Sequence, residues 1–109
     1  MAVITLTKDN FQAEVLSSNV PVLVDFWASW CGPCRMLGPV LEKIGESSKG
    51  FDVAKINVDE EQALAAQYQI MSIPTVLLFQ GGKVVAQSVG AVPEQTLRDL
   101  VRTHTGITE

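Results

Sequence analysis

The sequence predicts an α/β protein with a mixed sheet, and three observations support this prediction. Segments rich in β-branched and aliphatic residues alternate with segments in which apolar residues recur at helical spacing. The run Val22–Trp27 is almost continuously apolar, as is typical of a strand buried on both faces. Later in the chain, two strand-like runs flank Gln80-Gly81-Gly82-Lys83, which is the pattern of a β-hairpin. Alternating strands and helices followed by a hairpin indicate a sheet with both parallel and antiparallel neighbours.

The individual elements are predicted from hydrophobic periodicity, capping residues and turn signals. The expected elements are a short strand at Val3–Leu6, a helix capped by Thr7 that runs to about Leu16, a strand at Val22–Trp27, a strand at Val53–Val58, a helix from about Glu60 to Tyr68, strands at Thr75–Phe79 and Val84–Val89, and a helix from Pro93 to about Thr103. A further helix follows Trp27, because an apolar stripe runs from Leu37 to Ile44, and Pro39 should kink it.

Composition indicates one globular domain that spans residues 1–109. Hydrophobic residues make up 47% of the chain and charged residues 18%, and no repeat or linker divides it. Eight basic and twelve acidic residues give a net charge of −4. This balance argues against a nucleic acid or an anionic membrane as partner, since both require a basic face. The chain begins without a signal-peptide pattern, and Asp25 interrupts its best apolar run, so we expect a cytoplasmic protein.

The two cysteines, Cys31 and Cys34, point to redox chemistry. A disulfide between residues three apart would remove little entropy from the unfolded chain, so a purely structural role explains little. A zinc site needs about four ligands, and two cysteines with the distant His104 do not supply them. We therefore expect no metal. A pair of ordinary buried cysteines is the alternative.

The position of the Cys31-Gly32-Pro33-Cys34 motif supports the redox interpretation. It lies between a buried strand and a helix, and the N-terminus of a helix favours a thiolate over a thiol. Pro33 is tolerated in the first helical turn, and Gly32 lets another chain approach the first sulfur. We expect Cys31 to be exposed and to act as the nucleophile, and Cys34 to be shielded and to act as the resolving thiol.

The segment Val24–Arg35, which contains Trp30-Cys31-Gly32-Pro33-Cys34, closely resembles the active-site segment of thioredoxins. The resemblance extends to Lys55–Asp59, Ile73-Pro74-Thr75 and Gly90-Ala91. It implies the thioredoxin fold, with a central mixed sheet of about five strands flanked by about four helices. It also implies a protein-disulfide reductase that works through a reversible Cys31–Cys34 disulfide and a mixed-disulfide intermediate.

Two charged residues are candidates for tuning the cysteines. Burial of Asp25 within an apolar strand should raise its pKa, so that it can exchange a proton with Cys34 directly or through water. A carboxylate satisfied by a structural hydrogen bond is the alternative, and the resemblance favours the catalytic role. Lys55 lies in phase with Val53 and Asn57, and the resemblance places it beside Asp25 as a partial counter-charge. A solvated strand lysine is the alternative.

A docking surface for substrate is the remaining feature of the predicted site. The resemblance implies a cis bond before Pro74 that faces the sulfurs, and an Ile73 backbone that is offered to an extended substrate segment. A proline that merely begins a strand is the alternative. Trp27 should form a wall of the site and Trp30 should be exposed beside Cys31. The predicted apolar docking patch comprises Trp30, Gly32, Pro33, Ile73, Pro74, Gly90 and Ala91.

The resemblance also suggests partners. It implies recharging by a thioredoxin reductase, driven by NADPH or ferredoxin, and substrates such as ribonucleotide reductase, peroxiredoxins and methionine sulfoxide reductase. No phosphate-binding glycine loop is present, so we expect no nucleotide, flavin or metal cofactor. We also expect a monomer. A non-catalytic binding module and a disulfide-forming oxidant are the two alternatives. The Gly32-Pro33 dipeptide argues against the oxidant.

Overall fold

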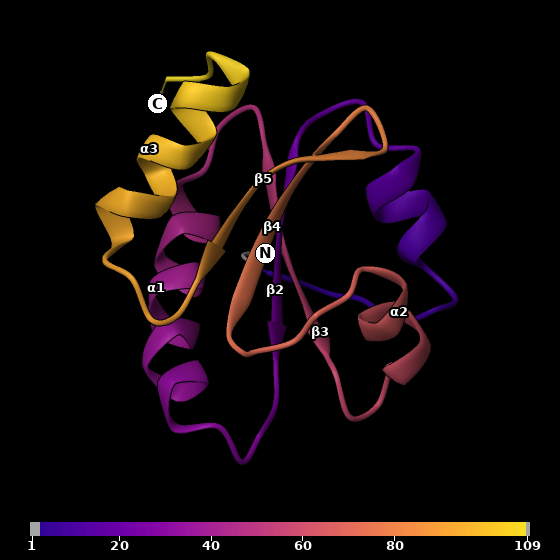
Figure 1. Cartoon of the computed structure of the whole chain (residues 1–109). Coiled ribbons are helices and arrows are strands. Elements are labelled where there is room, and N and C mark those ends of the chain that lie inside the picture. The colour runs from indigo at the N-terminus through magenta and orange to yellow at the C-terminus, as the bar shows by residue number, and fades with distance from the viewer. Residues whose placement is uncertain (1–2, 109) are drawn as a thin grey trace.

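The computed structural model describes residues 3–108 and contains a five-stranded mixed sheet with strand order β1-β3-β2-β4-β5 (Figure 1). The strands are β1 at Ile4–Thr5, β2 at Val22–Trp27, β3 at Asp52–Asn57, β4 at Thr75–Gln80 and β5 at Lys83–Val89. Strand β3 pairs in parallel with β1 and β2, whereas β4 is antiparallel to β2 and β5. The prediction of an α/β fold with a mixed sheet is confirmed.

Helices cover both faces of this sheet. They are η1 at Gln12–Leu16, α1 at Gly32–Ser47, α2 at Gln62–Gln67 and α3 at Glu94–Thr105. Figure 1 shows α1 and α3 on one face, with η1 and α2 on the other. Each face has its own core, one around Leu37, Leu78 and Leu97 and the other around Phe11, Phe26 and Phe79. None of the helices within residues 3–108 is long and apolar enough to cross a membrane.

Strand β2 lies at the centre of the sheet because nearly all of its side chains are apolar. Five of its six residues are buried, and Asp25 is the charged residue among them. Its register sets Asp25 opposite Lys55 of β3 and Val76 of β4. The end of β2, the end of β3 and the beginning of α1 meet at the lower edge of Figure 1. The sequence motif between β2 and α1 therefore lies at one edge of the sheet.

The first predicted helix differs from the observed one in extent and type. Helix η1 begins at Gln12 and contains π-type hydrogen bonding, with the Ser17 N–H donating to the Gln12 carbonyl at 2.8 Å. Thr7 caps the turn that leads into this helix: its hydroxyl accepts from the Asp9 N–H at 3.2 Å, and its carbonyl accepts from the Phe11 N–H at 3.0 Å. The chain therefore uses Thr7 as a turn residue before the helix begins. Phe11 and Val15 are both buried, as expected.

The predicted hairpin turn is confirmed at Gly81 and Gly82. Both residues have positive φ, 61° and 78°, which glycine adopts without a steric penalty. At Gly82 an added Cβ would also lie 3.0 Å from the carbonyl oxygen of Leu16. This turn lies at the edge of the sheet opposite the cysteine motif, so it fixes the fold without contributing to the site.

Candidate active site

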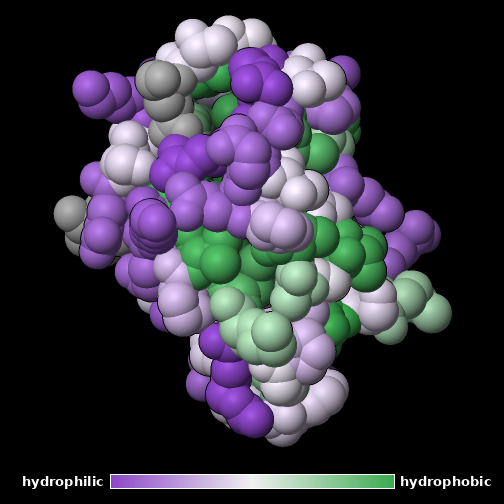
Figure 2. Space-filling model, turned by 90° about the vertical axis from the view of Figure 1, so that its left-hand side faces the viewer, coloured by the Kyte–Doolittle hydropathy of each residue, from purple (hydrophilic) through white to green (hydrophobic). Residues whose placement is uncertain are grey.

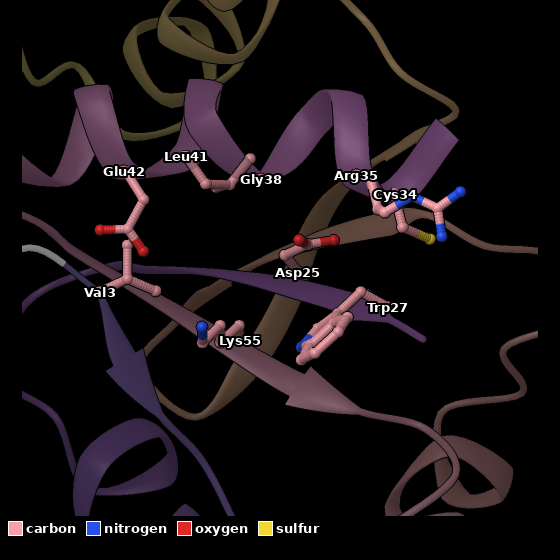
Figure 3. Close-up of a pocket in the computed structure, with 9 residues that line it drawn as sticks. All are labelled: Val3, Asp25, Trp27, Cys34, Arg35, Gly38, Leu41, Glu42 and Lys55. Atoms are coloured by element: carbon pink, nitrogen blue, oxygen red, sulfur yellow. The ribbon is translucent and has the colours of Figure 1, made fainter. Parts of the chain in front are cut away.

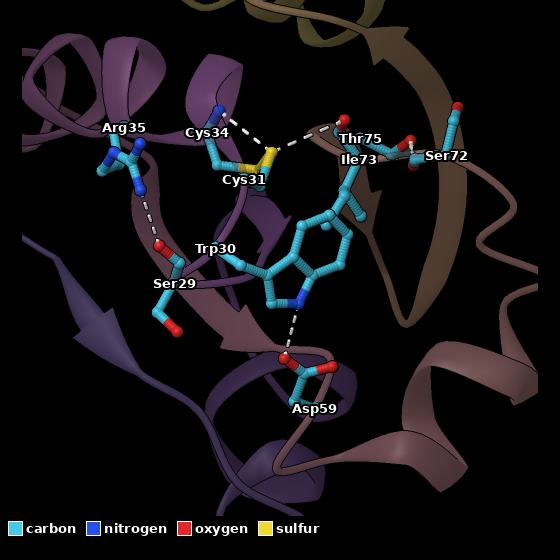
Figure 4. The surroundings of a disulfide bond; sticks show 9 residues. All are labelled: Ser29, Trp30, Cys31, Cys34, Arg35, Asp59, Ser72, Ile73 and Thr75. Atoms are coloured by element: carbon cyan, nitrogen blue, oxygen red, sulfur yellow. Dashed lines mark hydrogen bonds between the residues drawn. A yellow bond between two sulfur atoms is a disulfide. The ribbon is translucent and has the colours of Figure 1, made fainter.

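A disulfide joins Cys31 and Cys34 at the N-terminus of α1, with 5.2 Å between their Cα atoms (Figure 4). Cys31 is the N-cap residue and has an extended backbone, and Pro33 lies in the first turn. The Cys34 N–H donates to the Cys31 sulfur at 3.2 Å. This helix-capping arrangement directs a backbone donor and the positive end of the helix dipole at Cys31. The same donor would stabilise a thiolate at Cys31 when the disulfide is reduced.

Both cysteines are buried, so the prediction of an exposed Cys31 is wrong. Cys31 is 4% exposed and Cys34 is 3% exposed. The two residues pack with Ala28, and the side chains of Trp27 and Ile73 lie against them. The Cys31 sulfur lies 3.8 Å from the Ile73 carbonyl oxygen, in the loop that the resemblance placed facing the sulfurs. Exposure alone therefore does not distinguish the nucleophile from the resolving thiol.

The loop that precedes β4 covers the disulfide. Its Ile73–Pro74 bond is cis, as the resemblance implied. The Thr75 hydroxyl donates to the Ser72 carbonyl at 2.7 Å, and the Gly90 N–H donates to the Pro74 carbonyl at 2.8 Å. These two bonds fix the loop and bring the end of β5 beside it. Pro74 is buried, so it shapes the loop and does not contribute exposed surface to the predicted docking patch.

Trp30 projects beside the disulfide and is 67% exposed, as expected. Its indole N–H donates to an Asp59 carboxylate oxygen at 2.9 Å (Figure 4). The other members of the predicted patch also reach the surface: Gly32, Pro33 and Ala91 are exposed, and Ile73 and Gly90 are half-buried. We call Trp30, Gly32, Pro33, Ile73, Gly90 and Ala91 the docking surface. In Figure 2, which views the molecule from the side of α1 and α3, hydrophobic residues gather in the lower half, toward the end where α1 begins.

Two residues that support the redox turn were not predicted from the sequence. Asp59 orients Trp30, and the Arg35 guanidinium donates to the Ser29 carbonyl at 3.0 Å. The segment that resembles thioredoxins includes Asp59, but a hydrogen bond between residues 29 positions apart has no signal in a single sequence. The sequence shows the charge of Arg35 but not the carbonyl to which it donates.

Asp25 is 3% exposed, and one of its carboxylate oxygens has no hydrogen-bond partner. Burial raises the pKa of Asp25 from 3.8 to about 7, and the positive charge of Lys55 limits this rise. The predicted increase in pKa is confirmed, and so is the placement of Lys55 beside Asp25 in the register. The Lys55 ammonium also lies 5.5 Å from the centre of the Trp27 ring, so Trp27 forms a wall of this region.

A cavity of about 170 Å³ lies behind the disulfide and brings Asp25 and Cys34 together (Figure 3). Its lining residues are Val3, Asp25, Trp27, Cys34, Arg35, Gly38, Leu41, Glu42 and Lys55. Cys34 thus faces an interior carboxylate, whereas Cys31 faces the Ile73 loop. The arrangement combines a sulfur that has a backbone donor, a second sulfur beside a buried carboxylate, and an apolar surface around the first sulfur.

Comparison with known proteins identifies the family of this site. The family model described as Thioredoxin matches residues 2–103. The chain belongs to the thioredoxin family. It is 54% identical over 101 residues to a thioredoxin from Chlorobaculum thiosulfatiphilum, covering 92% of this chain and 94% of that protein. It is 51% identical over 100 residues to thioredoxin 1 from Nostoc sp., covering 91% of this chain and 94% of that protein.

A solved structure agrees with the fold. A mutant thioredoxin from Halobacterium salinarum superposes with a TM-score of 0.88 at 41% identity, covering 99% of this chain and 95% of that chain. With the cysteine pair of the thioredoxin family in place, the chain is a thiol–disulfide oxidoreductase with protein-disulfide reductase activity. A bifunctional thioredoxin reductase/thioredoxin from Mycobacterium leprae is 52% identical over 99 residues, which cover 89% of this chain and 22% of that protein.

Proposed function

We propose that Cys31 attacks the disulfide of a substrate protein and that Cys34 resolves the mixed disulfide. In the first step the Cys31 thiolate bonds to one substrate sulfur and the other leaves as a thiolate. In the second step the Cys34 thiolate bonds to Cys31, and the substrate leaves as its second thiolate, which takes a proton from solvent. The substrate gains two electrons, and the Cys31–Cys34 disulfide forms. The observation that carries this proposal is the backbone donor aimed at the Cys31 sulfur.

Asp25 is the proposed base for the second step. It lines the same cavity as Cys34, and its raised pKa of about 7 lets it accept and return a proton near neutral pH. Lys55 tunes this step, because its positive charge opposes the effect of burial on Asp25. Asp25 therefore takes the Cys34 proton as the resolving thiolate forms.

The docking surface is proposed to hold an extended segment of the substrate. Ile73 lies beside the Cys31 sulfur, and its half-buried backbone precedes β4. A substrate segment placed there could pair with this backbone, as an added strand pairs with a sheet edge. The exposed Trp30 ring would supply apolar contact next to the attacked disulfide.

The cellular location and the partners of the protein are also proposed. We propose that residues 1–109 act as one monomeric, cytoplasmic domain without a bound cofactor, recharged by a separate thioredoxin reductase. The fused reductase and thioredoxin of Mycobacterium leprae supports a reductase partner. Ribonucleotide reductase, peroxiredoxins and methionine sulfoxide reductase are the proposed acceptors, since the family resemblance implies them.

An insulin-reduction assay tests this function and its electron source together. We expect turnover with at least one of two reductases, an NADPH-dependent or a ferredoxin-dependent thioredoxin reductase. We expect no turnover when both cysteines are changed to serine. Turnover by that double variant would contradict the proposal, and so would activity confined to disulfide formation.

A further inference from the structure

The cavity behind the disulfide extends well beyond Cys34 and leads away from the docking surface. Cys34, Gly38 and Glu42 follow one another at four-residue spacing on one face of α1, so they span about 12 Å of helix. Figure 3 shows Cys34 at one end of this row and Glu42 at the other, with the Asp25 carboxyl between them. None of the six docking-surface residues lines the cavity. A substrate on the docking surface would therefore leave the Glu42 end uncovered.

Gly38 occupies a position where its backbone does not require glycine. Its φ is not in the left-handed region, and an added Cβ would meet nothing within 4 Å. Glycine weakens the interior of a helix relative to alanine. It does ease the contact with Pro39, because the residue before a proline is crowded in a helix. Because Gly38 lines the cavity and has no side chain, it also leaves the space beside Asp25 unfilled.

The cavity is suited to water. Its volume of about 170 Å³ exceeds the 10–15 Å³ that one water molecule needs on the same scale. The buried Asp25 oxygen without a hydrogen-bond partner offers an acceptor between the two ends. The Glu42 carboxylate and the Lys55 ammonium offer further polar partners among the lining residues.

We propose that Gly38 and Glu42 are positioning residues that set the pH at which Asp25 exchanges its proton. Gly38 leaves the cavity open, so water from the Glu42 end hydrates the Asp25 carboxylate and favours its charged form. Glu42 places a negative charge at the outer end and favours the protonated form. The inference rests on the proposed role of Asp25 and deepens it. It explains how Asp25 can exchange its proton with solvent while a substrate covers the sulfurs.

The surrounding groups agree with this assignment. The titratable or charged lining residues are Cys34, Arg35 and Glu42 from α1 and Lys55 from β3, while the lining residue Val3 and the β4 partner Val76 are apolar. The positive charge of Lys55 lowers the pKa of Asp25, and Glu42 is the other acidic residue that lines the cavity. Filling the cavity should therefore raise the pKa of Asp25, whereas neutralising Glu42 should lower it.

Two readouts test the proposal: the ¹³C titration of the Asp25 carboxyl, and the pH profile of the resolving step in single turnovers. Gly38→Leu should raise both midpoints by about one pH unit, a tenfold change in the proton equilibrium, and Gly38→Ala should raise them less. Glu42→Gln should lower both midpoints at low salt. Glu46→Gln, one turn further along α1 and outside the cavity, should change neither.

Added salt separates the two causes. Salt should diminish the Glu42→Gln effect and leave the Gly38→Leu effect, because salt screens charges at the open end but does not restore lost hydration. A folded Gly38→Leu protein with wild-type midpoints would overturn the role of Gly38. Equal behaviour of Glu42→Gln and Glu46→Gln would overturn the role of Glu42, even if the leucine variant fails to fold.

Asp25→Asn distinguishes this inference from the proposed function. If it removes the neutral-pH step of the profile while the Gly38 and Glu42 variants keep wild-type midpoints, the inference fails and the role of Asp25 stands. If Asp25→Asn leaves the profile unchanged, the role of Asp25 in resolution fails. In that case the ¹³C titration alone still decides whether Gly38 and Glu42 control the titration midpoint of the Asp25 carboxyl.

Discussion

The two sides of the Cys31–Cys34 disulfide are built in different ways. On the outer side, loops supply Trp30 and Ile73; a hydrogen bond to the distant Asp59 holds Trp30, and a local bond from Thr75 to Ser72 fixes the Ile73 loop. On the inner side, β2, β3 and α1 hold Asp25, Lys55 and Cys34 through strand register and helical spacing. The outer side exposes apolar surface, whereas the inner side buries a carboxylate. The difference suggests that the outer side selects substrates and the inner side controls proton transfer.

Replacing one cysteine at a time by serine gives the largest expected effect, because each substitution removes the sulfur of one side only. Cys34→Ser should keep attack by Cys31 and lose release, so covalent complexes with protein substrates should accumulate on non-reducing gels. Cys31→Ser should form few or none. The measurement is the yield of reducible complexes after incubation with a disulfide-containing protein. Trapping by Cys31→Ser instead would reverse the two cysteine roles.

Asp25→Asn tests the inner side through stability and rate. The folded-state pKa is raised to about 7, so ionising Asp25 above that pH costs the folded state about 4 kcal/mol. Below pH 4 the group is protonated in both states and the cost is absent. The variant should therefore gain stability over wild type as the pH rises from 4 to 7, and the gain should then level off.

Urea unfolding at a series of pH values measures this gain, and single-turnover kinetics should show slower resolution in the same variant. Lys55→Gln provides the comparison, because loss of the positive charge should raise the pKa of Asp25 further. A stability difference that does not depend on pH would show that Asp25 is ionised, or neutral, in both states alike.

Trp30→Ala tests the outer side. Loss of an exposed aromatic anchor should lower kcat/KM for a protein disulfide about tenfold, while a small reagent such as a dithiobis-nitrobenzoate should react nearly as before. Met36→Ala is the control, because Met36 is 69% exposed, close to the 67% of Trp30, and lies outside the docking surface. Equal loss with both disulfides would place Trp30 in the chemistry and not in docking.

The inner side could be predicted from the sequence to a large extent, partly from residue patterns and partly from the family resemblance. A carboxylate within a continuous apolar run predicted the burial and raised pKa of Asp25, and the family resemblance placed Lys55 beside it. On the outer side, the resemblance placed the Ile73 loop facing the sulfurs, but nothing in the sequence showed that this loop buries Cys31. The burial of Cys31 depends on the Ile73 loop, which lies 42 residues away in the chain. No pattern in a single sequence sets the distance between such loops.

The boundary between predicted and unpredicted features also appears in the helices. Helix α1 is amphipathic, and the spacing of its apolar residues from Leu37 to Ile44 predicted that it forms. Helix η1 is short, and local turn bonds at Thr7 displaced its start. Long periodic segments carry their structure in sequence, whereas short ones depend on individual hydrogen bonds.

Asp59→Ala gives the smallest expected effect and asks whether the outer side works as a unit. The Trp30 indole would lose its acceptor, which costs about 1 kcal/mol when both groups are accessible to water. We therefore expect kcat/KM for a protein disulfide to fall about fivefold, and the midpoints for Asp25 to stay unchanged. Asp59→Asn is the matched control, since its amide oxygen still accepts a hydrogen bond.

A double-mutant cycle decides whether Asp59 acts through Trp30. In the Trp30→Ala background the indole is already absent, so Asp59→Ala should have no further effect on kcat/KM. The interaction energy would then equal the whole effect of the single Asp59 change. Additive losses would mean that Asp59 contacts the substrate itself, and the outer side would then consist of two independent contacts and not one oriented ring.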